Sequence, residues 1–232
     1  MADIDDAFDQ LYSSPEQFMQ TYYFKLTGAY DPPNSPNPKT SGLSIFRFSE
    51  IEYCPMTLNG HAVEGYEATV LRDNPGRVLQ SGKVGNVNWL EFRAYYCAMK
   101  KAGTGLNGGA PGGSYFSLPP DGDYELMITS QLSGCTFGIG NQVQGGACTV
   151  SHLEPADKSP TGNILMQQQT NALHGNNVNV MFQHSLRGGG GQGYDERAHI
   201  VGKRGPNGIW HFWAQRFKGG FVKEIEGVDT LC

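Results

Sequence analysis

From Leu43 to the C-terminus the chain is built of short apolar or alternating runs separated by glycine and other turn residues. Alternation of apolar and polar side chains is typical of strands with one buried face. The chain has 32 glycines among its 232 residues, and a helical bundle is disfavoured because glycine destabilises a helix interior by about 1 kcal/mol relative to alanine. We therefore predict an α+β fold with a central β-sandwich of mixed sheets and helices packed outside.

The individual strands are predicted from runs that alternate or that carry β-branched and aromatic residues. They lie at 43–53, 61–71, 123–134, 135–143, 146–153, 176–186, 197–203, 208–217 and 219–227. The segment 88–101 has the length of a helix, although its aromatic residues also suit a buried strand, and we predict a helix there. The glycine-rich segments 101–113 and 187–193 are predicted loops, and the first lacks the Gly-Lys-Ser/Thr ending of a phosphate-binding loop.

The N-terminal part of the chain has helix signals. Ser14 and Pro15 show the pattern of an N-cap followed by proline at the first helical position. We predict helices over 4–12 and 15–26, then a proline-rich loop. We interpret the whole chain as one domain and as a monomer. Its parts are an N-terminal helical extension over 1–27, the proline-rich loop over 28–42 and the β-sandwich core over 43–232. The extension is a candidate lid or secretion-related arm.

Composition excludes several classes of partner and site. A formal charge of −5 argues against nucleic acid, which needs a basic surface. No apolar run is long enough to span a bilayer, and the acidic start does not have the pattern of a signal peptide. The five cysteines form no CxxC pair, which disfavours a disulfide framework and a zinc site and favours a reducing compartment. The histidines lack metal-ligand spacing, so we predict no metal and no cofactor.

Cys135 is the candidate nucleophile. A thiol attacks as the thiolate and therefore needs a neighbouring base. Its position after Ser133 and Gly134 leaves room for a substrate to approach the backbone, whose N–H groups could hold an oxyanion. His152 follows on a neighbouring predicted strand, where a hairpin can bring its imidazole to the thiol. The alternative is a buried, inert cysteine, which is the more common role of this residue type.

Residues 129–135, with the sequence TSQLSGC, resemble the Thr-x-x-Leu-Ser-Gly-Cys signature of the Burkholderia lethal factor type of glutamine deamidase. This type is related in fold to the catalytic domain of the cytotoxic necrotizing factors, which share the Leu-Ser-Gly-Cys tetrad and a downstream histidine. The segment is also similar to the chemoreceptor glutamine deamidases, whose Gly-Gly and His-x-x-x-Pro elements residues 145–155 approximate. The resemblance covers about 30 residues, 125–155.

The resemblance implies a toxin-like protein glutamine deamidase with a catalytic triad of Cys135, His152 and Thr129. Cys135 would attack the side-chain carboxamide of a glutamine, His152 would act as general base and acid, and Thr129 would orient the imidazole. Gly134 and Cys135 would supply backbone N–H groups to the oxyanion, and Ser133 is needed for its small size. The implied partner is a target-cell protein with a surface glutamine, with a translation factor as one candidate. The implied location is the bacterial cytoplasm, followed by export to the target-cell cytosol.

Three alternatives remain open from the residues themselves. A transglutaminase would use a primary amine in place of water on the same thioester, and a cysteine protease would use the same dyad. A non-catalytic β-sandwich binding module would bury Cys135 in its core. In that case the glycine-rich loops at 103–113 and 187–193 would be the binding loops.

Overall fold

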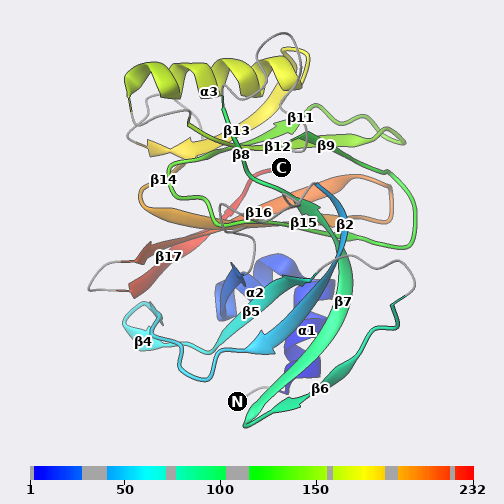
Figure 1. Ribbon diagram of the computed structural model, residues 1–232, viewed down its shortest axis with the longest axis vertical. Coiled ribbons are helices and arrows are strands. Elements are labelled where there is room, and N and C mark those ends of the chain that lie inside the picture. The colour runs from blue at the N-terminus through cyan, green and yellow to red at the C-terminus, as the bar shows by residue number, and fades with distance from the viewer. Residues whose placement is uncertain are drawn as a thin grey trace.

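The computed structural model describes residues 3–27, 41–71, 77–102, 115–155, 159–185, 193–219 and 223–232. The predicted α+β sandwich is confirmed (Figure 1). Two mixed sheets pack against each other, and helices cover the outer faces of the two sheets. The described helices are α1 (Ile4–Ser13), α2 (Pro15–Thr21) and α3 (Pro160–Leu173).

The larger sheet, sheet A, has the strand order β1-β5-β2-β7-β10-β15-β16-β17-β3-β4, with β6 paired to β7. Its β1–β5 and β7–β10 pairs are parallel, whereas β2–β7 and β15–β16 are antiparallel. The strands are β1 (Tyr23–Thr27), β2 (Gly42–Glu50), β3 (Thr57–Leu58), β4 (His61–Ala62), β5 (Gly65–Leu71), β6 (Ser81–Val84), β7 (Val87–Cys97), β10 (Leu126–Thr129), β15 (Arg197–Arg204), β16 (Trp210–Gly219) and β17 (Lys223–Thr230).

The smaller sheet, sheet B, has the order β14-β13-β11-β12-β8, with β9 paired to β12. The strands are β8 (Lys100–Lys101), β9 (Tyr115–Leu118), β11 (Thr136–Gly140), β12 (Cys148–Glu154), β13 (Val178–His184) and β14 (Gly193–Tyr194). Its inner face packs on β10, β15 and β16 of sheet A through one apolar cluster. The rings of Phe137 and Phe212, one from each sheet, have their centroids 6.1 Å apart in this cluster.

The predicted helix over 88–101 is wrong, because residues 87–97 form the long strand β7. Phe92 and Tyr96 pack against the cluster that contains α1 and α2, whereas Tyr95 and Cys97 face the cluster between the sheets. Both faces of this part of the strand are therefore covered. A strand buried on both faces is a continuous apolar run, which periodicity does not distinguish from a buried helix.

The second predicted helix is too long. Helix α2 ends at Thr21, and residues 23–27 form β1, which pairs with β5 inside sheet A. Gln215 on β16 explains the break, since its buried amide donates to the carbonyls of Met19 and Tyr22 and accepts the N–H of Phe24. Residues 1–27 are therefore not all helical, and α1 and α2 share one apolar cluster with sheet A.

Helix α3 is an element that the sequence patterns did not reveal. Ser159 caps it by accepting the N–H of Gly162 at 3.1 Å, and Pro160 occupies the first turn. The helix covers the outer face of sheet B (Figure 1). The contact is close at Gly138 on β11, where an added Cβ would lie 2.6 Å from Thr170 Cγ2 on α3 and 2.7 Å from Ser151 Oγ on β12.

Most of the proline-rich loop predicted over 28–42 lies outside the described residues. The same holds for residues 103–113 of the loop predicted over 101–113, whose first residue instead belongs to β8. Of the predicted loop over 187–193, only Gly193 is described, and it belongs to β14.

We predict that Gly138→Ala lowers the free energy of unfolding by about 1–3 kcal/mol, because the new methyl group overpacks the contact between α3 and β11. Denaturant unfolding measures the loss. The matched variant Gly138→Ala/Thr170→Ser removes the nearest clashing methyl group and should regain part of the stability. Equal stability of Gly138→Ala and the parent chain would contradict this packing.

Candidate functional site

Cys135 and His152 lie on neighbouring strands of sheet B. Cys135 immediately precedes β11, and His152 on β12 is directly opposite Phe137 in the antiparallel register. Residues two apart on a strand share a face. Cys135 is therefore the diagonal neighbour of His152 on the inner face, a relation in which side chains are within reach of each other. The predicted hairpin relation between β11 and β12 is thus present, although it alone does not establish a thiol–imidazole contact.

Thr129 joins His152 to the other sheet. It is the last residue of β10 in sheet A, and its Oγ1 lies 2.7 Å from His152 Nδ1. The same hydroxyl donates to the carbonyl of Cys97 on β7 at 2.7 Å. A hydroxyl has a single proton, so Thr129 must accept from Nδ1–H. The arrangement therefore favours the tautomer whose Nε2 has the basic lone pair.

His152 is completely buried, with a relative exposure of 0%. Loss of hydration lowers its pKa to about 3, so the imidazole is neutral near pH 7. Its Nε2 has no hydrogen-bond partner among the described residues. Ser130 adds a longer contact, with its Oγ 3.3 Å from Nδ1. A neutral imidazole with a fixed tautomer is the form that acts as a general base.

Met99 contacts the buried thiol of Cys135. Cys135 is only 3% exposed, and its Sγ lies 3.4 Å from Met99 Sδ. Met99 itself is half-buried and lies in the short connection between β7 of sheet A and β8 of sheet B. The thioether is therefore one of the groups that bury the Cys135 thiol.

Tyr194 on β14 hydrogen-bonds the backbone of Gly134 and Cys135, the two residues predicted to supply oxyanion donors. Its hydroxyl accepts the N–H of Gly134 at 2.9 Å and donates to the carbonyl of Cys135 at 2.8 Å. Gly134 has a φ of +90°, a conformation that residues with a side chain rarely adopt. Ser133 is exposed. The N–H of Gly134 is therefore already bonded, and its role as an oxyanion donor stays a prediction that requires Tyr194 to release it.

Sequence reasoning did not identify the neighbours that hold the three predicted residues. Cys97, Met99 and Tyr194 come from distant parts of the chain, and no local motif connects them with Cys135. Ser130 could have been found, since it directly follows Thr129 and has the same hydroxyl chemistry.

The remaining cysteines have inert surroundings. All five cysteines are described, and none forms a disulfide. Burial raises the pKa of Cys97 and Cys148 to about 12, which keeps these thiols protonated and unreactive. Within the described residues, no group of three or more histidine, cysteine or acidic side chains is placed to hold a metal ion.

His199 on β15 is a second buried histidine. It is 1% exposed, its two ring nitrogens have no partner among the described residues, and its ring stacks on Phe217 with centroids 4.9 Å apart. Burial first, and then the charges of Lys25 and Arg197, lower its pKa to about 3. Tyr23 contacts the ring edge-on. This apolar and cationic environment favours the neutral form of the imidazole.

The chain matches no protein-family model and no curated protein. None of the described helices is long and apolar enough to cross a membrane.

We predict that Met99→Ala accelerates alkylation of Cys135 by iodoacetamide about tenfold or more, because the truncated side chain no longer covers the thiol. Peptide mapping by mass spectrometry assigns the alkylated cysteine. Met99→Leu keeps the bulk and should leave the rate unchanged. Met181→Ala, a half-buried methionine on the other face of sheet B, is the matched control. An unchanged rate in Met99→Ala would show that Met99 is not the barrier.

We predict that stability falls as the pH drops below about 6.5. The folded-state pKa of His199 is depressed from 6.5 to about 3, so between these values the unfolded chain binds the extra proton. The slope per such histidine is about 1.4 kcal/mol per pH unit, and His152 and His174 add to it. His199→Phe retains the ring stacking and should flatten the dependence between pH values of about 6.5 and 5 in denaturant unfolding. If the unfolding free energy of His199→Phe varied with pH as steeply as that of the parent, the assignment of the pH dependence to His199 would be refuted.

Proposed function

We propose that the chain is a protein glutamine deamidase that uses Cys135 as nucleophile and His152 as general base. The observation that carries the proposal is the pair of 2.7 Å contacts of Thr129, which leave His152 Nε2 as the basic nitrogen on the same face as Cys135. The resemblance of residues 129–135 to the lethal factor signature supports the same three residues. The contacts of Thr129 and the resemblance therefore support the same proposal.

The reaction balances with these groups alone. His152 Nε2 takes the thiol proton, and the Cys135 thiolate attacks the carboxamide carbon of a substrate glutamine. The tetrahedral intermediate collapses as His152 returns the proton to the leaving nitrogen, which departs as ammonia. A γ-glutamyl thioester of Cys135 remains. Water, deprotonated by His152, then hydrolyses the thioester to glutamate and restores the thiol.

Burial of the site requires a second state of the protein. In the described state Cys135 is 3% exposed, with Met99 in contact with its thiol, and a carboxamide cannot reach it. Hydration of the opened site would also raise the pKa of His152 towards its ordinary value, since desolvation is the cause of the shift. Opening would therefore give access and basicity together.

A non-catalytic binding module is the second candidate, and the burial of Cys135 and His152 is the observation that favours it. In that reading the thiol packs against Met99 as a small apolar group. The hydrogen bond between Thr129 and His152 would then only join the two sheets.

Mass spectrometry of target-cell lysate proteins after incubation with the chain tests the proposal. We expect conversion of specific glutamines to glutamates, and Cys135→Ser should abolish it while it leaves the unfolding transition intact. Amine adducts in place of glutamate would indicate a transglutaminase, and new termini would indicate a protease. Two negative results would favour the binding module: no modified glutamine and no new terminus in any lysate protein, and no reaction of Cys135 with iodoacetamide in the Met99→Ala variant.

Thr129 is a positioning residue in this scheme, and its variants separate that role from a structural one. Thr129→Val keeps the shape but removes the hydroxyl, so we expect kcat for deamidation to fall by about tenfold or more with a small change in KM. Thr129→Ser restores the hydroxyl and should restore most of kcat. If both variants had the same kcat, orientation of His152 by the hydroxyl would be refuted.

A further inference from the structure

A second polar constellation lies on β2 and β7 of sheet A, at residues of β7 that precede the Cys97 carbonyl to which Thr129 donates. In the β2–β7 register Arg47 is directly opposite Glu91. Trp89 and Arg93 are two residues from Glu91 on the same strand and therefore share its face. The other face of this strand carries Phe92, which packs against the cluster containing α1 and α2.

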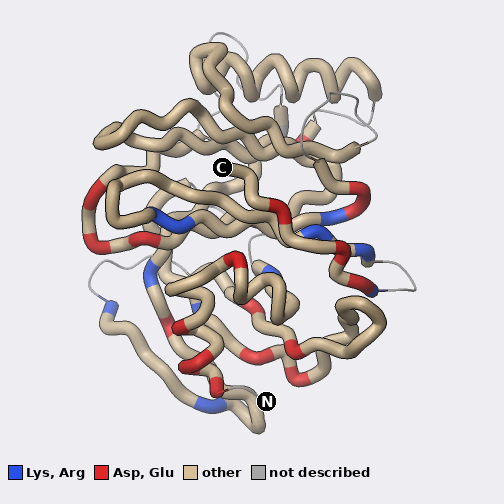
Figure 2. The backbone as a smooth tube through the Cα atoms, turned by 180° about the vertical axis from the view of Figure 1, so that it is seen from behind, with Lys and Arg blue, Asp and Glu red and all other residues tan. Residues whose placement is uncertain are grey.

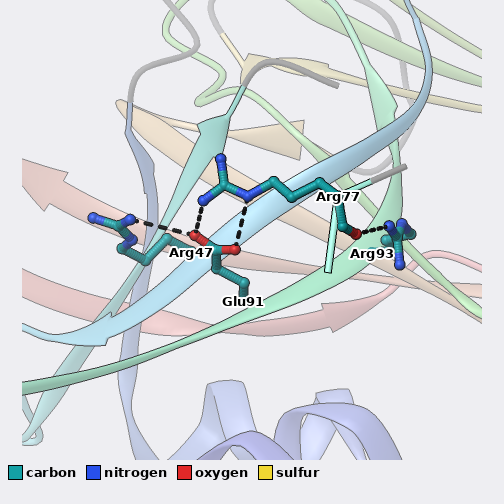
Figure 3. A network of polar contacts seen from close by, with 4 residues as sticks. All are labelled: Arg47, Arg77, Glu91 and Arg93. Carbon is teal, nitrogen blue, oxygen red and sulfur yellow. Dashed lines mark hydrogen bonds and ion pairs between the residues drawn. The ribbon is translucent and has the colours of Figure 1, made fainter. Parts of the chain in front are cut away.

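Two arginines bind the one carboxylate, and a third lies at the other end of Arg77 (Figure 3). Arg77 binds both oxygens of Glu91, with Nη2–Oε1 and Nε–Oε2 distances of 2.5 and 3.1 Å. Arg47 Nη2 lies 3.3 Å from Oε1. Arg93 points to the opposite end of Arg77 and donates to its backbone carbonyl at 2.6 Å. We refer to Arg47, Arg77, Arg93 and Glu91 together as the arginine cluster.

The arginine cluster has more donors than acceptors. Its formal charge is three positive charges minus one, or +2, in a chain whose net charge is −5. The guanidinium of Arg47 lies 4.2 Å from the ring centre of Trp89. Arg47 Nε and Trp89 Nε1 are both buried and have no hydrogen-bond partner among the described residues. Buried donors without acceptors are destabilising, so adjacent orphan donors indicate a place for an acceptor-rich group.

The cluster is open to a ligand. The side chains of Arg47 and Arg77 are 37% and 33% exposed, whereas that of Glu91 is 0% exposed. Glu91 therefore binds the guanidinium groups of Arg47 and Arg77 on their buried side, and their outer edges reach solvent. Asp and Glu, 22 in number, outnumber the 17 Lys and Arg of the chain, and Figure 2 marks the positions of both kinds along the described backbone.

We propose that the arginine cluster binds a phosphate-type oxyanion. A phosphate dianion is opposite in sign to the net positive charge of the cluster and has several acceptor oxygens for the spare guanidinium N–H groups that reach solvent. Planar, charged guanidinium groups bind such oxygens through paired, charge-assisted hydrogen bonds. A carboxylate supplies one charge and two oxygens and satisfies this cluster less well. The site is independent of the Cys135 chemistry.

Titration with inorganic phosphate at constant ionic strength, followed by ¹⁵N–¹H NMR of the indole N–H groups, tests the proposal. Trp89→Phe identifies the Trp89 resonance. We expect this resonance to shift saturably with phosphate and the affinity to fall about tenfold or more in Arg93→Gln, which leaves both ion pairs of Glu91 in place. Arg47→Gln should weaken binding similarly, and unfolding midpoints confirm that both variants are folded.

Arg216→Gln is the matched control, because Arg216 on β16 already pairs with Asp229 at 2.7 Å and has Glu226 within 3.9 Å. It should bind phosphate as the parent does. Saturation by acetate at the same concentration would overturn the assignment to phosphate. A non-saturable shift, an equal response to chloride, or an equal loss of affinity in Arg216→Gln would overturn the site itself.

Discussion

The single hydroxyl proton of Thr129 determines how the candidate site is organised. It is donated to the carbonyl of Cys97, so the oxygen must accept from His152 Nδ1. The acceptor carbonyl belongs to β7, the hydroxyl to β10, and the imidazole to β12 of the other sheet. One side chain thus selects the tautomer of the base and joins the two layers of the sandwich. Loss of that hydroxyl would leave the buried imidazole with only the longer contact of Ser130 Oγ at 3.3 Å.

The connection that leaves β7 affects both members of the dyad. Cys97 accepts the Thr129 proton that orients the base, and Met99 contacts the sulfur of the nucleophile two residues later. This connection passes from sheet A to sheet B, where β8 pairs with β12 next to His152. A movement of Met99 away from the thiol would therefore also act on the nearby backbone of Cys97. The carbonyl of Cys97 accepts the Thr129 hydroxyl that contacts His152. Access to the thiol and orientation of the imidazole are not independent properties in this fold.

The sequence predicts the sandwich because alternation and glycine spacing are local properties of each strand. Prediction from the sequence fails where tertiary contacts determine the structure. Strand β7 is covered on both faces and therefore lacks alternation. Helix α2 ends at Thr21 because Gln215 hydrogen-bonds the backbone there. The three predicted site residues are found in one short motif and its neighbour strand, whereas Met99 and Tyr194 become neighbours of Cys135 only through the sheet topology. The arginine cluster likewise forms only when β2 and β7 pair in register.

Burial gives the candidate site two opposed effects. It keeps the imidazole neutral and its tautomer fixed, which favours a base, but the same desolvation opposes the imidazolium that forms when the base accepts a proton. A thiolate at Cys135 would be the closest counter-charge for that imidazolium, and the apolar cluster around it stabilises neither ion. Proton transfer in the closed state is therefore unfavourable, and the proposed chemistry would require a state in which water or a substrate carboxamide enters. In the proposed enzyme, a closed site of this kind would protect the thiol until a substrate is present.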